Sequence, residues 1–163
     1  MEITSIISIT LGLISILLAF ISIYVALKIS KKTSNIDLKA DNKTIKEVIK
    51  ETELNEDATN LDFENIDTAI NLMQGKEHNA EYYYLLGLKE YKNGYYNDAE
   101  NNFQKAIILK NEKYPAALFY LGHTYLKQSK YEGDDFYNKA KAYFGKAKDL
   151  GHRYAEKRLK KMK

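Results

Sequence analysis

The residues best suited to chemistry in this 163-residue sequence are three histidines and one pair of adjacent carboxylates. No two of His78, His123 and His152 have the i, i+4 spacing that puts two metal ligands on one helix face. The chain has no cysteine, so disulfides, thiolate zinc sites and a cysteine nucleophile are excluded. Asp134-Asp135 is the best candidate for acid–base catalysis, but a cap at a helix start explains that pair better. We therefore predict no enzyme activity: no catalytic residue, no metal site and no cofactor.

The elements that could position other functional residues begin with an apolar segment. Ile3 to Leu27 is a run of 25 residues without a charge. As a helix it would be about 37 Å long, which exceeds a hydrocarbon core about 30 Å thick. The run is also longer than the apolar part of a signal peptide and lacks its basic start. These features predict a transmembrane helix at residues 3–29.

The charges that flank this helix predict its orientation. Lys28, Lys31 and Lys32 all follow the apolar run, whereas only Met1 and Glu2 precede it. Because basic residues stay on the cytoplasmic side, we predict a single-pass cell-membrane protein with its C-terminal part in the cytoplasm. The reversed topology is the alternative, which protease protection of the C-terminus in intact cells would reveal.

Small residues in the apolar run recur at alternating spacings of three and four. Such a seam follows one side of a helix, and small side chains let helices approach closely in lipid. One hypothesis is that the seam pairs with a second copy or with another membrane protein. The other is that a membrane helix merely tolerates these residues. The seam consists of Ser5, Ser8, Gly12, Ser15, Ala19, Ser22 and Ala26.

Residues 30–60 form a polar stretch that we predict to be a flexible linker. The stretch has no aromatic residue and few aliphatic ones, so it buries too little surface to fold alone. Ile45, Val48, Ile49 and Thr52 have helical spacing, which indicates at most a short, marginal helix.

A repeated pattern occupies residues 61–163. Tyr83-Tyr-Leu-Leu-Gly87 is answered by Leu118-Phe-Tyr-Leu-Gly122, and an Ala-x3-Phe-x2-Ala pattern follows each of them. We predict two helical hairpins, in which glycine and alanine let backbones approach and phenylalanine fills the space between them. The second copy has six extra residues, which we place in a polar loop. The framework residues are Leu86, Gly87, Ala99, Phe103 and Ala106, then Leu121, Gly122, Ala140, Phe144 and Ala147.

Boundary residues agree with these hairpins. Asn79 is a predicted N-cap and Gly94 a predicted helix stop. Asn97 with Glu100 reads as a capping box for the next helix. We place the repeats at about 80–113 and 115–151 and capping helices at 62–74 and 152–162, so six helices in all.

This pattern resembles the tetratricopeptide repeat family and its longer Sel-like relatives. The first unit matches at Leu86-Gly87, Gly94, Tyr96, Ala99 and Phe103. The second matches at Leu121-Gly122, Lys139-Ala140, Tyr143-Phe144 and Leu150-Gly151. The resemblance implies an all-α superhelix that acts in protein–protein interaction.

It also implies a peptide-binding groove lined by the first helix of each repeat. Aromatic side chains with a lysine on each unit would suit a segment that has an apolar anchor and an acidic group or a C-terminal carboxylate. The alternative is that the aromatic residues simply pack against a neighbouring helix. The predicted groove residues are Tyr84, Leu88, Tyr91, Lys92, Phe119, His123, Leu126 and Lys127.

Positive charge gathers at the C-terminal end. Residues 139–163 hold ten basic and two acidic side chains. A solvated capping helix and a helix lying on anionic lipid both fit this pattern. Nucleic-acid binding is not expected, because no RNA- or DNA-binding motif accompanies the charge.

Together these patterns favour a membrane-anchored scaffold that recruits a protein or peptide through a helical-repeat groove. The alternative is a small membrane-assembly or effector subunit that forms homo-oligomers through its transmembrane helix, with the repeats as a regulatory domain.

Overall fold

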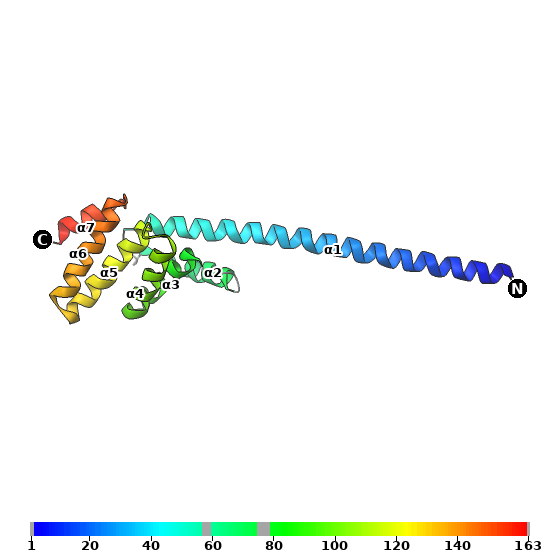
Figure 1. Ribbon diagram of the computed structural model, residues 1–163, viewed down its shortest axis with the longest axis horizontal. Coiled ribbons are helices and arrows are strands. Elements are labelled where there is room, and N and C mark those ends of the chain that lie inside the picture. The colour runs from blue at the N-terminus through cyan, green and yellow to red at the C-terminus, as the bar shows by residue number, and fades with distance from the viewer. Residues whose placement is uncertain (1, 57–59, 75–78, 163) are drawn as a thin grey trace. The chain divides into compact units, whose positions relative to one another are not determined.

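The computed structural model describes residues 2–56, 60–74 and 79–162, without the side chains of residues 2–15, 17, 33–38 and 40. This part of the chain is helical and has no strand, which confirms the all-α fold class (Figure 1). Its helices are α1 (Glu2–Glu53), α2 (Phe63–Met73), α3 (Ala80–Asn93), α4 (Tyr96–Leu109), α5 (Pro115–Glu132), α6 (Asp134–Asp149) and α7 (Ala155–Lys161).

The chain divides into two compact units, residues 1–43 and 44–163. The first unit consists of the N-terminal part of α1. Over the residues that the structure describes, no helix combines the length and apolar character needed to cross a membrane. The side chains of Ser5, Ser8, Gly12 and Ser15 lie outside the described ones, and those of Ala19, Ser22 and Ala26 are exposed.

The predicted flexible linker is wrong for residues 30–53, because α1 continues without a break to Glu53. Ile45, Val48 and Thr52 are buried in the second unit. The spacing of these side chains places them on one side of the helix, so their burial there stabilises turns that would be marginal in isolation.

The second unit contains two successive helical hairpins, α3 with α4 and α5 with α6 (Figure 1). Gly87 of α3 lies against the ring of Phe103 of α4, and Gly122 of α5 lies against the ring of Phe144 of α6. A Cβ atom at Gly87 would be only 2.6 Å from Phe103 Cε1. The ring therefore occupies the space of the absent side chain. The framework residues are all buried except Leu86, which is half-buried.

The six extra residues of the second hairpin lengthen helices, so the predicted loop is wrong. α5 has 18 residues against 14 in α3, and α6 has 16 against 14 in α4. Only Gly133 separates α5 from α6, and its φ of 87° suits a residue without a side chain. The polar composition of this stretch reflects the exposed faces of two helix ends.

The predicted caps are confirmed at two positions and wrong at a third. Asn79 accepts a hydrogen bond from the Tyr82 backbone N–H at 3.0 Å, and Gly94 ends α3 in the left-handed conformation. Asn97 does not cap α4, which begins one residue earlier, at Tyr96. Its Oδ1 instead accepts a hydrogen bond from Gln128 Nε2 of α5 at 2.9 Å.

α5 is the central helix of the unit. Eleven of its residues are buried, among them the consecutive run from Ala116 to Tyr125. It packs against α4 and α6 and also contacts α3. A helix that is apolar all round must be enclosed by its neighbours. On the outer sides, α2 packs on α3 through Ile66, Ala69, Ile70 and Met73, and α7 packs on α6.

Candidate partner-binding site

The predicted groove residues lie on α3 and α5, but most of them are not exposed. Leu88 and the rings of Tyr84 and Phe119 are fully buried, and Tyr91 and His123 are 8% and 4% exposed. We call the side of α3 and α5 that carries these five residues the inner face. Only Lys92 among the eight predicted residues is exposed, and Leu126 and Lys127 are half-buried. An open groove was therefore the wrong prediction, and the alternative of aromatic packing holds for these rings.

The inner face is packed by aromatic side chains from several helices. Tyr84 lies 6.2 Å from Phe103 and from Tyr120, and 5.1 Å from Tyr114, between ring centroids. Phe119 lies 5.4 Å from Phe144, edge to face. Tilted and edge-to-face pairs at such distances are the favourable arrangements of aromatic rings.

One part of this face is covered by residues 44–56, which we call the α1 end segment. The Tyr120 hydroxyl donates to the carbonyl oxygens of Thr52 and Asn55, at 3.5 and 3.4 Å. Thr52 lies in the last turn of α1 and Asn55 lies just beyond it, and the Thr52 carbonyl also accepts a hydrogen bond from the Asn55 backbone N–H at 3.3 Å. Burial raises the pKa of Tyr84 well above its ordinary value, and Thr52 and Glu53 lie beside its hydroxyl. The α1 end segment thus contacts both α3 and α5.

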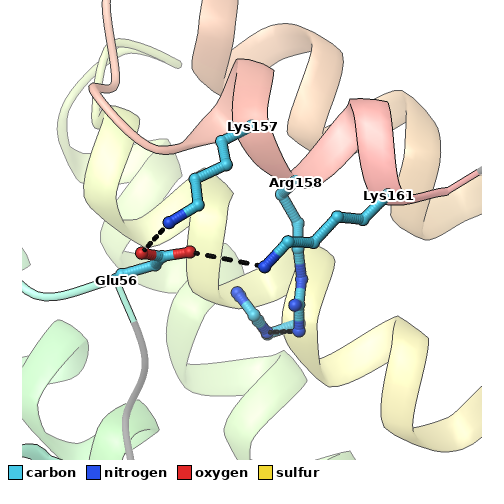
Figure 2. A network of polar contacts seen from close by, with 5 residues as sticks. Glu56, Lys157, Arg158 and Lys161 are labelled. Atoms are coloured by element: carbon cyan, nitrogen blue, oxygen red, sulfur yellow. Dashed lines mark hydrogen bonds and ion pairs between the residues drawn. The ribbon is translucent and has the colours of Figure 1, made fainter.

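An acidic group at the end of this segment meets the basic helix α7 (Figure 2). Glu56 accepts a hydrogen bond from Lys157 Nζ at 2.7 Å, and Lys161 Nζ lies 3.9 Å from its other oxygen. The hydrogen bond from Lys157 lowers the pKa of Glu56. The side chains of the two lysines are 57% and 58% exposed and that of Glu56 is 37% exposed, so water and salt screen the pairs and the direct gain in stability is small. The two lysines therefore favour a negative charge at this position, but they contribute little to how tightly the α1 end segment is bound.

The other part of the inner face is covered by the connection between α6 and α7 and by α7 itself. The His152 ring stacks on Phe119, with centroids 4.0 Å apart. The Arg158 guanidinium lies 3.2 Å from His123 Nδ1, which must act as the acceptor because arginine only donates. The predicted basic end is thus more than a solvated cap, since Lys157 and Lys161 contact Glu56 of the α1 end segment and Arg158 contacts α5.

His152 gives the unit a pH dependence. Burial lowers its pKa to about 4, and neither ring nitrogen has a hydrogen-bond partner among the described residues. In an unfolded chain this histidine would bind a proton near pH 6.5. The unit therefore has its full free energy of unfolding above that pH and loses part of it as the pH drops towards 4. Between pH 7 and pH 5 we expect a loss of about 1 to 2 kcal/mol, after allowance for the water that reaches the ring.

Urea unfolding of the full chain at pH 7, 6 and 5 would measure this loss. The control is His152→Phe, which keeps an aromatic ring over Phe119 and removes the titration. Equal pH slopes for the two proteins would show that His152 does not carry the effect.

An open pocket of about 460 Å³ adjoins the α1 end segment. Glu53 and Leu54 of the segment line it, together with the basic residues Lys110, Lys113 and Arg153. Burial raises the pKa of Glu53, which lies near Tyr114, Glu81 and Lys110. Glu53 thus lies among residues of mixed charge, and Lys110 is itself paired with Glu81.

Sequence reasoning identified the inner-face residues but missed what covers them. Thr52, Tyr114, Tyr120 and Glu56 were not candidates, although the helical spacing of Ile45, Val48 and Thr52 was a usable signal. Within the described part of the chain, no group of three or more histidines and carboxylates lies close enough to hold a metal ion. Comparisons with protein-family models, with curated proteins and with solved structures found no match.

Proposed function

We propose that this protein is a membrane-anchored scaffold. An N-terminal transmembrane helix would hold a domain of tetratricopeptide or Sel-like hairpins at the cytoplasmic side of the cell membrane, where the domain recruits a protein or peptide partner. The observation that carries the proposal is the contact between a helix glycine and a phenylalanine ring, made in the same way in both hairpins. Stacked helical hairpins of this kind form extended binding surfaces.

The anchor is supported by the composition and exposure of α1. The run from Ile3 to Leu27 carries no charge. Among its described side chains, large apolar groups such as Ile16, Phe20, Tyr24 and Leu27 are 54 to 66% exposed on the isolated helix. Exposed apolar surface of this extent marks a helix that is covered by something else, and a length above about 20 residues suits lipid.

The test uses the full chain with a C-terminal affinity tag. We expect it to remain in the membrane fraction after carbonate extraction, and to capture a defined set of proteins after solubilisation in mild detergent. Ile16→Arg with Phe20→Arg should release it, since each arginine near the centre of the span costs about 2.5 to 3.5 kcal/mol. Ser30→Arg, beyond the apolar run, is the matched control and should remain in the membrane. Release of the unaltered chain would contradict the anchor, and capture of no protein would contradict the scaffold.

A second candidate function is a small membrane-assembly or effector subunit that oligomerises through its transmembrane helix. The alternating three- and four-residue spacing of small residues favours it. Dye leakage from liposomes that contain the full chain would support this function. The same liposomes with Ala19→Ile and Ser22→Ile, which fill the seam, should then lose the leakage.

A further inference from the structure

We propose that the inner face is a receptor for an amphipathic helix with an acidic C-terminal end, and that the α1 end segment is its resident ligand. A partner helix of this chemistry would have to displace residues 44–56 before it could bind. This inference rests on the proposed scaffold function, because it names the chemistry of the partner and the regulation of the same domain.

The apolar side of the resident ligand defines the first requirement. Ile45, Val48 and Thr52 are 8%, 6% and 2% exposed, whereas Lys46 and Lys50 on the opposite side are exposed. Spacings of three and four residues place the buried side chains in one stripe. A displacing helix therefore needs small or medium aliphatic residues at a first position and at the positions three and seven residues after it, with polar residues between them.

The acidic end defines the second requirement. Glu56 lies between Lys157 and Lys161 of α7 (Figure 2). Glu53 lies near Glu81 and near Lys110, which follows the last residue of α4. Basic groups of α7 thus meet Glu56, whereas the charge around Glu53 is mixed, because Lys110 is paired with Glu81. Charge complementarity of this kind selects partners and rejects wrong ones. A displacing helix with a lysine at the position of Glu56 would face like charges.

The contacts of the segment suit a ligand that can leave. Its hydrogen bonds with Tyr120 are 3.4 and 3.5 Å long, at the weak end of the range, and its ion pairs are exposed. The rest of the inner face packs rings that are fully buried, such as Tyr84 and Phe119. The connection to α2 keeps the segment near its site, at an effective concentration of about millimolar. A free ligand must compete with that concentration, so its apparent affinity is lowered in the closed protein.

The experiment measures binding of a fluorescent synthetic peptide with the sequence of residues 42–56 to the full chain in detergent micelles. The loosened variant is Ile45→Ala with Val48→Ala, and the matched control is Lys46→Ala with Lys50→Ala. We expect the loosened variant to bind the peptide with an apparent Kd at least about tenfold lower than the unaltered chain. The lysine control should behave as the unaltered chain does.

A second peptide, with Glu56→Lys, tests the acidic requirement. At low ionic strength it should bind the loosened variant at least about threefold more weakly than the first peptide. Equal binding of the two peptides would overturn the assignment of an acidic partner.

Circular dichroism verifies that the loosened variant is folded. If it is not, Glu56→Gln replaces it, because this change removes the charge that pairs with Lys157 and Lys161 from the resident segment and leaves it in the peptide. The expected gain in affinity at low ionic strength is then about threefold. Equal peptide binding by all variants would overturn the proposal. If the unaltered chain forms dimers and the loosened variant does not, the segment is exchanged between two copies. That result would overturn the proposal that the segment binds within its own chain.

These outcomes separate the inference from the scaffold proposal. Capture of the same proteins by the unaltered and loosened chains would leave the scaffold intact and place the partner elsewhere on the domain. If the peptide binds but the chain captures no protein, the proposed receptor face is supported and the scaffold function is contradicted.

Discussion

Replacing Phe144 with alanine is expected to lower the free energy of unfolding of residues 44–163 by about 3 to 5 kcal/mol. The ring is fully buried, contacts Gly122 across the second hairpin, and lies 5.4 Å from Phe119 and 5.1 Å from His123. Its loss would leave a cavity against a glycine, which has no side chain that can move into the space. A loss of this size is comparable to the whole stability of a small domain.

Urea unfolding of the full chain, followed by near-ultraviolet circular dichroism of its tyrosines, measures this change, because every tyrosine except Tyr24 lies in residues 44–163. Phe103→Ala should behave in the same way, because that ring is also fully buried and lies against Gly87. Tyr131→Ala is the surface control, at 85% exposure, and should change stability by less than about 0.5 kcal/mol. A similar effect of all three changes would show that the two phenylalanines are not central to the hairpins.

Glycine-to-alanine substitutions are expected to have opposite effects at different positions. At Gly87 and Gly122 the new methyl group would lie 2.6 and 2.9 Å from a phenylalanine ring that has nowhere to move, so we expect a loss of about 1 to 3 kcal/mol. At Gly145, inside α6, the methyl group would meet nothing within 4 Å. Alanine there should raise stability by up to about 1 kcal/mol, because it is the better helix former.

Thermal or urea unfolding of the three single variants compares the same chemical change at three sites. The double variant Gly87→Ala with Phe103→Leu should recover part of the loss, since leucine is smaller and more flexible than the ring. A gain in stability at Gly87 similar to that at Gly145 would contradict the close contact between α3 and α4.

The internal repeat was the part of the fold that the sequence predicted best. A leucine precedes both Gly87 and Gly122, and Phe103 and Phe144 stand in the same Ala-x3-Phe-x2-Ala pattern. Such a recurrence predicts local packing within a hairpin. Asn79 and Gly94 could be assigned because caps depend on only a few neighbouring residues. Asn97 could not, because its interaction partner, Gln128, is 31 residues away on another helix.

The state of the candidate site could not be predicted in the same way. Periodicity shows that Tyr84 and Phe119 face something apolar, but not whether this is a partner or the same chain. The α1 end segment has only three buried side chains in its helix, among many charged residues, so its composition resembles that of a linker. Burial against the hairpins, a long-range contact, overrides that local preference.

The enclosure of α5 has a consequence for how the domain comes apart. In long repeat arrays each unit contacts only its neighbours, and the ends can fray while the middle persists. Here the second hairpin supplies the centre, because α5 has buried residues on all sides and contacts α3, α4 and α6. Neither hairpin can open without exposing that helix, so this short stack loses its structure in one cooperative step.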